Sequence, residues 1–204
     1  MKKKLFAIAA VVICLAITAG GTLAYYTAEQ VTHNVITTGN VSAEIVEMRK
    51  VPTEDGSTRL ETYPQDQPIL VMPGTQHSKI VSVKNTGKGD AWVRIHLDLA
   101  ITNPDNRPLD VTIRTAEDVE QALVTMDFND ADWWKDGDYY YYKQPLKAGA
   151  ETAPLFTTVF FNPAMDNGYQ DSLFDVTVEM QAVQAANNPV PAGGTVAAVQ
   201  GWPA

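Results

Sequence analysis

The feature that most constrains the fold of this chain is the strict alternation of apolar and polar residues over 174–181. Its apolar members are Phe174, Val176, Val178 and Met180. Because successive side chains of a β-strand point to opposite faces of its sheet, this period of two predicts a strand with one buried face. The stretch 91–99 alternates in the same way, with apolar residues at Ala91, Val93, Ile95, Leu97 and Leu99. Both stretches favour an all-β fold.

Further short apolar stretches, separated by turn sequences, run through most of the chain. We expect strands over 41–48, 69–72, 78–84, 139–142 and 155–161. Turns are expected at Glu54–Ser57, where Asp-Gly suits a tight hairpin, and at Asn85–Gly87, which would join 78–84 and 91–99 as a hairpin. Strands of this length and spacing are typical of an antiparallel, immunoglobulin-like β-sandwich.

One short helical insertion is expected at Thr115–Thr125. Thr115 has the residue type of a helix cap, and the acidic residues Glu117 and Asp118 would lie in the first turn. Val119, Ala122 and Leu123 follow at helical spacing. The pattern predicts a helix that covers one side or end of the sheets.

The N-terminus has the pattern of a secretory signal peptide. Lys2, Lys3 and Lys4 precede the apolar run 5–19, and small residues follow up to Ala24. We expect residues 1–24 to be removed by cleavage between Ala24 and Tyr25, with membrane contact only before cleavage. The alternative is an uncleaved anchor, since 5–24 could just cross a bilayer.

Cleavage would leave an acidic chain without cysteine. Residues 1–24 hold the only cysteine, Cys14, together with three lysines and no acidic residue, so their removal changes the formal net charge from −9 to −12. Such a surface repels nucleic acid and anionic lipid, and disulfide bonds are excluded. We expect a secreted protein, extracellular or associated with the cell surface. Its parts would be an N-terminal arm or donor strand at 25–40, a β-sandwich domain at 41–186 and a flexible tail at 187–204.

No motif assigns a catalytic, cofactor-binding or metal-binding residue, and we expect no cofactor. The three histidines, His33, His77 and His96, lack zinc-helix spacing, although a zinc site built from separate strands stays open. The acidic stretch 127–138 fails the EF-hand template, since Ala131 and Asp132 occupy its fifth and sixth positions; an irregular calcium loop or a solvated loop remains. The aromatic stretch 133–142 suits core packing, sugar binding or an assembly surface.

Three segments resemble a known family. The lysines and apolar run ending in GGTLAYYT, followed by NVITTGNVSAEI, look like the signal and first strand of proteins processed by the SipW-type signal peptidase. PGTQHSKIVSVKNTGKGDAWVRIHL, and the stretches DGDYYYYKQPLKAGAETAPLFTTVFF and MDNGYQDSLFDVTVEMQAVQAAN, resemble TasA-type biofilm-matrix fibre proteins and camelysins of Gram-positive bacteria. The resemblance implies export, a jelly-roll β-sandwich and, in fibre-forming members, polymerisation by an N-terminal strand. Camelysins are described as surface metalloproteases, but this chain lacks a zinc-protease motif.

Two functional hypotheses follow. In the first, the chain is a structural subunit that self-associates into filaments, and its N-terminal strand pairs with a sheet edge of the next subunit. The expected assembly residues are Val31, Val35 and Ile36. In the second, it is a monomeric cell-envelope binding module or camelysin-like metalloprotease, with a site at 127–142 or at the three histidines.

Overall fold

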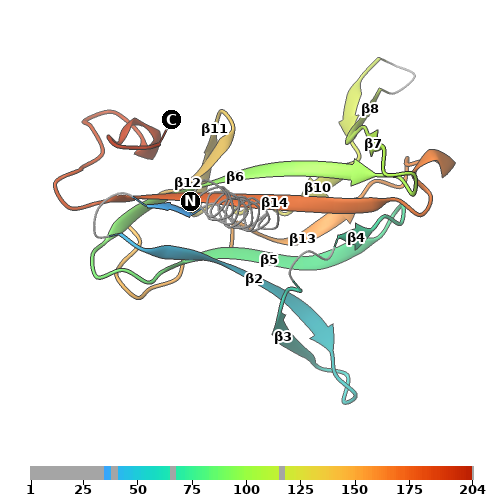
Figure 1. Ribbon diagram of the computed structural model, residues 1–204, viewed down its shortest axis with the longest axis horizontal. Helices are drawn as coiled ribbons and strands as arrows, with labels where there is room; N and C mark the ends of the chain where they lie inside the picture. Colours follow the sequence, from blue (N-terminus) through green and yellow to red (C-terminus); the bar gives the residue numbers. More distant parts are fainter. Residues whose placement is uncertain (1–34, 38–40, 65–67, 115–117, 204) are drawn as a thin grey trace, which may run out of the picture. The chain divides into compact units, whose positions relative to one another are not determined.

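The computed structural model describes residues 35–37, 41–64, 68–114 and 118–203. These residues form a predominantly antiparallel β-sandwich of two sheets, which confirms the expected all-β class (Figure 1). The expected signal peptide, its cleavage site at Ala24 and Tyr25, and Val31 lie outside the described residues. Within the described part of the chain, no helix has the length and apolar character needed to cross a membrane.

The first sheet contains the longest strands. Its main order is β1-β14-β6-β12-β11, with β4 beside β14 and β7 beside β6. β14 and β6 pair antiparallel from Leu173↔Thr102 to Gln184↔Ala91. The strands are β1 (Val35–Thr37), β4 (Ile69–Leu70), β6 (Ala91–Thr102), β7 (Pro108–Leu109), β11 (Trp133–Asp136), β12 (Tyr139–Tyr142) and β14 (Leu173–Gln184).

The second sheet has the order β10-β13-β5-β2-β3. The expected turn at Glu54–Ser57 is confirmed: it joins β2 to β3, and Gly56 adopts φ +82° there. The strands are β2 (Ala43–Pro52), β3 (Thr58–Thr62), β5 (Gln76–Asn85), β10 (Val124–Met126) and β13 (Phe156–Phe161). A separate pair consists of β8 (Thr112–Arg114) and β9 (Glu120–Ala122), and two 3₁₀ turns are η1 (Asn167–Tyr169) and η2 (Val196–Ala198).

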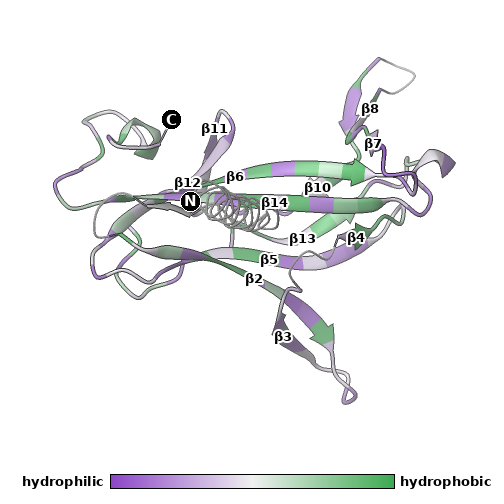
Figure 2. Ribbon diagram, in the orientation of Figure 1, coloured by the Kyte–Doolittle hydropathy of each residue, from purple (hydrophilic) through white to green (hydrophobic). Residues whose placement is uncertain are grey.

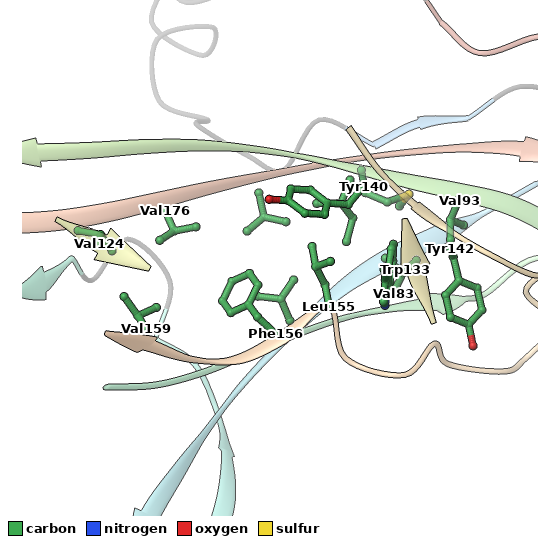
Figure 3. Close-up of a cluster of buried hydrophobic side chains, with 14 of the residues drawn as sticks. Val83, Val93, Val124, Trp133, Tyr140, Tyr142, Leu155, Phe156, Val159 and Val176 are labelled. Carbon is green, nitrogen blue, oxygen red and sulfur yellow. The ribbon is translucent and has the colours of Figure 1, made fainter. Parts of the chain in front are cut away.

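The core lies between the sheets and follows the predicted alternation. The four apolar residues of the 174–181 pattern are all buried, and hydrophobic residues are interspersed with hydrophilic ones along β6 and β14 (Figure 2). Leu155 and Phe156 are fully buried, and Figure 3 shows them in the cluster with Val83 and Tyr140. Burial of these side chains supplies the main stabilising free energy of the sandwich.

The helix expected at Thr115–Thr125 is contradicted. Described residues of this stretch form β9 and β10, and Asp118 adopts φ +60°, which ends a right-handed helix. β10 pairs with β13 over Val124↔Phe161 to Met126↔Val159, and Leu123 becomes fully buried. Tertiary pairing of β-branched residues therefore outweighs the weak helical spacing.

The hairpin expected between 78–84 and 91–99 is also wrong. β5 pairs with β2 and β13 in the second sheet, whereas β6 pairs with β14 and β12 in the first. The connection crosses between sheets at the buried Asn85, whose Nδ2 donates to the carbonyl oxygens of Gly89 at 2.8 Å and Leu146 at 3.0 Å. The Asn-Thr-Gly turn thus connects the second sheet to the first.

Candidate assembly site

The candidate assembly site is the edge of the first sheet, at β14. β6 lies along one side of β14 over its whole length. On the opposite side, β4 pairs antiparallel with Leu173 and Phe174, and β1 pairs parallel with 180–182. β1 is one of the two outermost strands in this order, with β11 at the other end, so it supplies part of one edge of the sheet.

Two of the three expected assembly residues lie in β1. Val35 is the Cα partner of Met180, and Ile36 is the Cα partner of Gln181. The pairing of β1 with β14 is parallel, whereas the other strand pairs of the described residues are antiparallel. Main-chain hydrogen bonds, which depend little on sequence, hold a strand in such an edge position.

The aromatic stretch 133–142 is divided between two clusters. Trp133, Tyr140 and Tyr142 are buried in the core between the sheets. Trp134, Tyr139 and Tyr141 belong to a second cluster on the outer face of the first sheet, which also contains Trp92 and Val183. Core packing, one of the roles expected of this stretch, therefore accounts for Trp133, Tyr140 and Tyr142.

The C-terminal segment covers this outer face instead of extending away as the flexible tail expected at 187–204. Trp92 Nε1 donates to the carbonyl oxygen of Asn188 at 2.8 Å. Val196 and Val199 are buried in the outer cluster, and the ring of Trp202 packs edge-on against Tyr141 with centroids 5.7 Å apart. A groove of about 320 Å³ remains beside Trp134 and Tyr141.

Arg94 anchors the segment. Its Nε donates to Gln181 Oε1 at 2.6 Å, its Nη1 to the Tyr141 hydroxyl at 3.2 Å and its Nη2 to the Pro203 carbonyl at 2.7 Å. The guanidinium also lies 3.7 Å from the ring centroid of Tyr139. Arg94 is only 7% exposed, and no described carboxylate forms an ion pair with it. Sequence alternation placed it on an outer face but gave no sign that a distant segment covers that face.

The histidines do not come together as a metal site within the described residues. His77 lies on β5, packs edge-on against Phe161 and has its pKa lowered by burial. His96 lies on β6 of the other sheet, with Nδ1 at 2.9 Å from the carbonyl oxygen of Asp138. His33 is outside the described residues. The described residues hold no group of three or more His, Cys, Asp or Glu that could bind a metal ion.

The first acidic residues of 127–138 make structural hydrogen bonds. Asp127 Oδ1 accepts from the backbone N–H groups of Thr157 at 2.8 Å and Thr158 at 2.6 Å. Asp132 Oδ2 accepts from Asn129 Nδ2 at 2.9 Å. The bonds of Asp127 tie the stretch to the start of β13, whereas the bond of Asp132 lies within the stretch.

A scan against protein-family models finds no match, and no curated protein or solved structure matches the chain.

Proposed function

We propose that this chain is a secreted structural subunit that assembles by N-terminal strand donation, in the manner of the TasA-type fibre proteins that its segments resemble. The observation that carries the proposal is the place of β1, a short strand from the N-terminal segment at the outer edge of the first sheet. Cleavage after Ala24 by a SipW-type signal peptidase would free that segment. Exchange of β1 between copies would then join subunits without any covalent bond between them.

Head-to-tail exchange gives a filament. Each subunit donates its own N-terminal strand and accepts one at β14, so the contact uses two different surfaces and does not close into a dimer by itself. A chain of formal net charge −12 after cleavage repels its neighbours at low ionic strength. We therefore expect assembly to be favoured by salt, which screens this repulsion.

Electron microscopy of the secreted material, combined with N-terminal sequencing, tests the proposal. We expect filaments whose subunits begin at Tyr25, and no such filaments from a variant that lacks 25–38. Filaments of unchanged form from that variant would contradict strand donation. Persistent monomers that bind soluble glycans through the groove at Trp134 and Tyr141 would instead support a cell-envelope binding module.

A further inference from the structure

The strand β3 (Thr58–Thr62) lies at the edge of the second sheet (Figure 1). It pairs with β2 along one side, and no strand of the described residues pairs with its other side. Four of its five residues are exposed. Leu60, at 58%, has the largest exposed fraction among the exposed large hydrophobic side chains that the structure describes. An edge of this kind can accept a further strand through main-chain hydrogen bonds.

The hydrogen bonds to β2 show which groups of β3 face the free edge. The N–H of Tyr63 donates to the carbonyl oxygen of Glu47 at 2.8 Å, and the N–H of Thr53 donates to the carbonyl oxygen of Ser57 at 2.9 Å. In an antiparallel pair, hydrogen-bonded and non-hydrogen-bonded positions alternate along each strand. The residues whose N–H and C=O groups point to the free edge are therefore Thr58, Leu60 and Thr62.

The sequence of β3 is complementary to itself. Thr-Arg-Leu-Glu-Thr has leucine at its centre, one charged residue of each sign beside it and threonine at both ends. In an antiparallel pair of two such strands centred on Leu60, Arg59 of each copy lies opposite Glu61 of the other. An edge with a single type of charge would repel its own copy, whereas this order of charges attracts it.

The centred register also agrees with the hydrogen-bond positions. Leu60 would exchange main-chain hydrogen bonds with Leu60 of the second copy, and Thr58 would exchange them with Thr62, because the groups of these residues face the free edge. Arg59 and Glu61 would then form the non-hydrogen-bonded pairs, in which Cα atoms are about 4.5 Å apart and side chains lie closest. The charges therefore meet at the positions where they interact best.

The carboxylate of Glu61 has arginine neighbours that suit this arrangement. Within one chain, it lies 2.5 Å from Nη2 of Arg59 and 3.3 Å from Nη2 of Arg49, its Cα partner in β2. In the pair of copies, Glu61 would lie between Arg49 of its own chain and Arg59 of the second copy. The side chain of Arg59 is 65% exposed, so it can turn to the new partner without loss of burial.

We propose that β3 pairs antiparallel with β3 of a second copy, centred on Leu60, so that the second sheets of two copies form one continuous sheet. The contact has two-fold symmetry. It involves five residues of each copy, so a single contact is weak and dilute chains stay separate. Many such contacts act together where many copies are held close to one another.

This contact uses a different sheet from strand donation and does not depend on it. Strand donation joins subunits end to end at β14 of the first sheet, whereas β3 lies at the edge of the second sheet. If both contacts operate, pairing of β3 joins neighbouring filaments side by side.

Disulfide trapping tests the register. The cleaved chain has no cysteine, so Leu60→Cys introduces a single one. In the proposed pair, the two Cα atoms at position 60 are about 5.5 Å apart, within the range that a disulfide bridges. Thr58→Cys is the matched control, because position 58 lies opposite Thr62 and its two copies are about 14 Å apart. With diamide as oxidant, we expect Leu60→Cys to form covalent dimers at least tenfold faster than Thr58→Cys, measured on non-reducing gels.

Charge reversal in the Leu60→Cys chain tests the ionic pairs. Arg59→Glu and Glu61→Arg should each slow the formation of covalent dimers about tenfold, because like charges then face each other. A mixture of the two variants should regain the original rate, since an acidic edge then faces a basic one. Mass spectrometry identifies the mixed dimers. A folding defect would not be repaired by mixing.

Arg114→Glu is the control for charge reversal. The side chains of Arg114 and Arg59 are both 65% exposed and both paired with an acidic residue, but Arg114 lies on β8 of the separate two-stranded pair. Arg114→Glu should change the rate less than twofold. Should Glu61→Arg fail to fold, Arg59→Glu and the comparison of the two cysteine positions still decide the matter. Equal trapping at positions 58 and 60, or an effect of Arg59→Glu no larger than that of Arg114→Glu, would overturn the proposal and leave strand donation standing.

Discussion

The Nη2 of Arg94 donates a hydrogen bond of 2.7 Å to the carbonyl oxygen of Pro203, 109 residues further along the chain. This bond ties the end of the described chain to the middle of the first sheet. The C-terminal segment is therefore a structural part of the sandwich, and it shields the outward aromatic residues from solvent.

Replacement of Arg94 by alanine should release the C-terminal segment. The change removes three hydrogen bonds from a side chain that is 7% exposed, so we expect a loss of about 2–4 kcal/mol in the free energy of unfolding. Tryptophan emission should shift to longer wavelength as Trp202 enters water. The control is Arg114→Ala, whose side chain is 65% exposed and should change stability by less than about 0.5 kcal/mol. Equal losses from both would contradict the anchoring role.

Sequence analysis predicted the strands well where apolar residues alternate with polar ones. β14 follows its alternation because only one arrangement buries Phe174, Val176 and Val178. The helix at Thr115–Thr125 failed because helical spacing over a short stretch is a weak signal against pairing with β13. The crossing at Asn85 and the docking of the C-terminal segment depend on contacts between distant residues, such as Asn85 with Leu146, which no local pattern encodes.

The same reasoning applies to the candidate site. Val35 and Ile36 were expected in a strand that pairs with the sheet edge of a neighbouring subunit. The structure places both in β1, which pairs with β14 of the same chain. Residues 35–37 alone predict neither the parallel orientation of β1 nor the identity of its partner strand, β14. The sequence also gave no sign of a cleft of about 480 Å³ lined by Arg49, Tyr63 and Leu70, because its lining comes from four separate stretches of the chain.

The buried ion pair between Glu47 and Lys79 should be far more costly to break than to replace. Lys79→Met leaves the carboxylate of Glu47 buried without its partner, so we expect a loss of about 3–5 kcal/mol. The double variant Glu47→Leu with Lys79→Met should recover most of it, measured by denaturant unfolding. In the exposed pair Lys147–Asp90, at a similar 2.6 Å, Lys147→Met should cost less than about 1 kcal/mol. A double variant as unstable as Lys79→Met would contradict this account.

Asp127 should contribute to acid unfolding. Partial burial raises its pKa, but hydrogen bonds from Thr157 and Thr158 outweigh this effect and hold the pKa below the ordinary value of 3.8. A lowered pKa in the folded state means that the stabilisation is present above about pH 4 and is lost as the pH falls further. Asp127→Asn should therefore cost about 1 kcal/mol at pH 7, with the difference from wild type shrinking below about pH 4.

Unfolding by urea at several pH values measures this difference. The exposed Asp136 on β11 supplies the control, since Asp136→Asn should leave the free energy of unfolding nearly unchanged over the same range. A difference between Asp127→Asn and wild type that stays constant down to pH 2 would rule out the titration of Asp127 as its source.

A disulfide that holds β1 in its own chain should prevent assembly until it is reduced. Thr37 and Ala182 are Cα partners in the parallel pair, and neighbouring strands lie about 4.8 Å apart, within the range that a disulfide bridges. The cleaved chain has no cysteine of its own, so Thr37→Cys with Ala182→Cys introduces one defined pair. With the disulfide formed inside each chain, β1 cannot be donated, and we expect monomers in light scattering. Reduction should restore filaments, and both single-cysteine variants should assemble under either condition. Filaments from chains whose internal disulfide is verified by mass spectrometry would show that exchange of β1 is not the step that joins subunits.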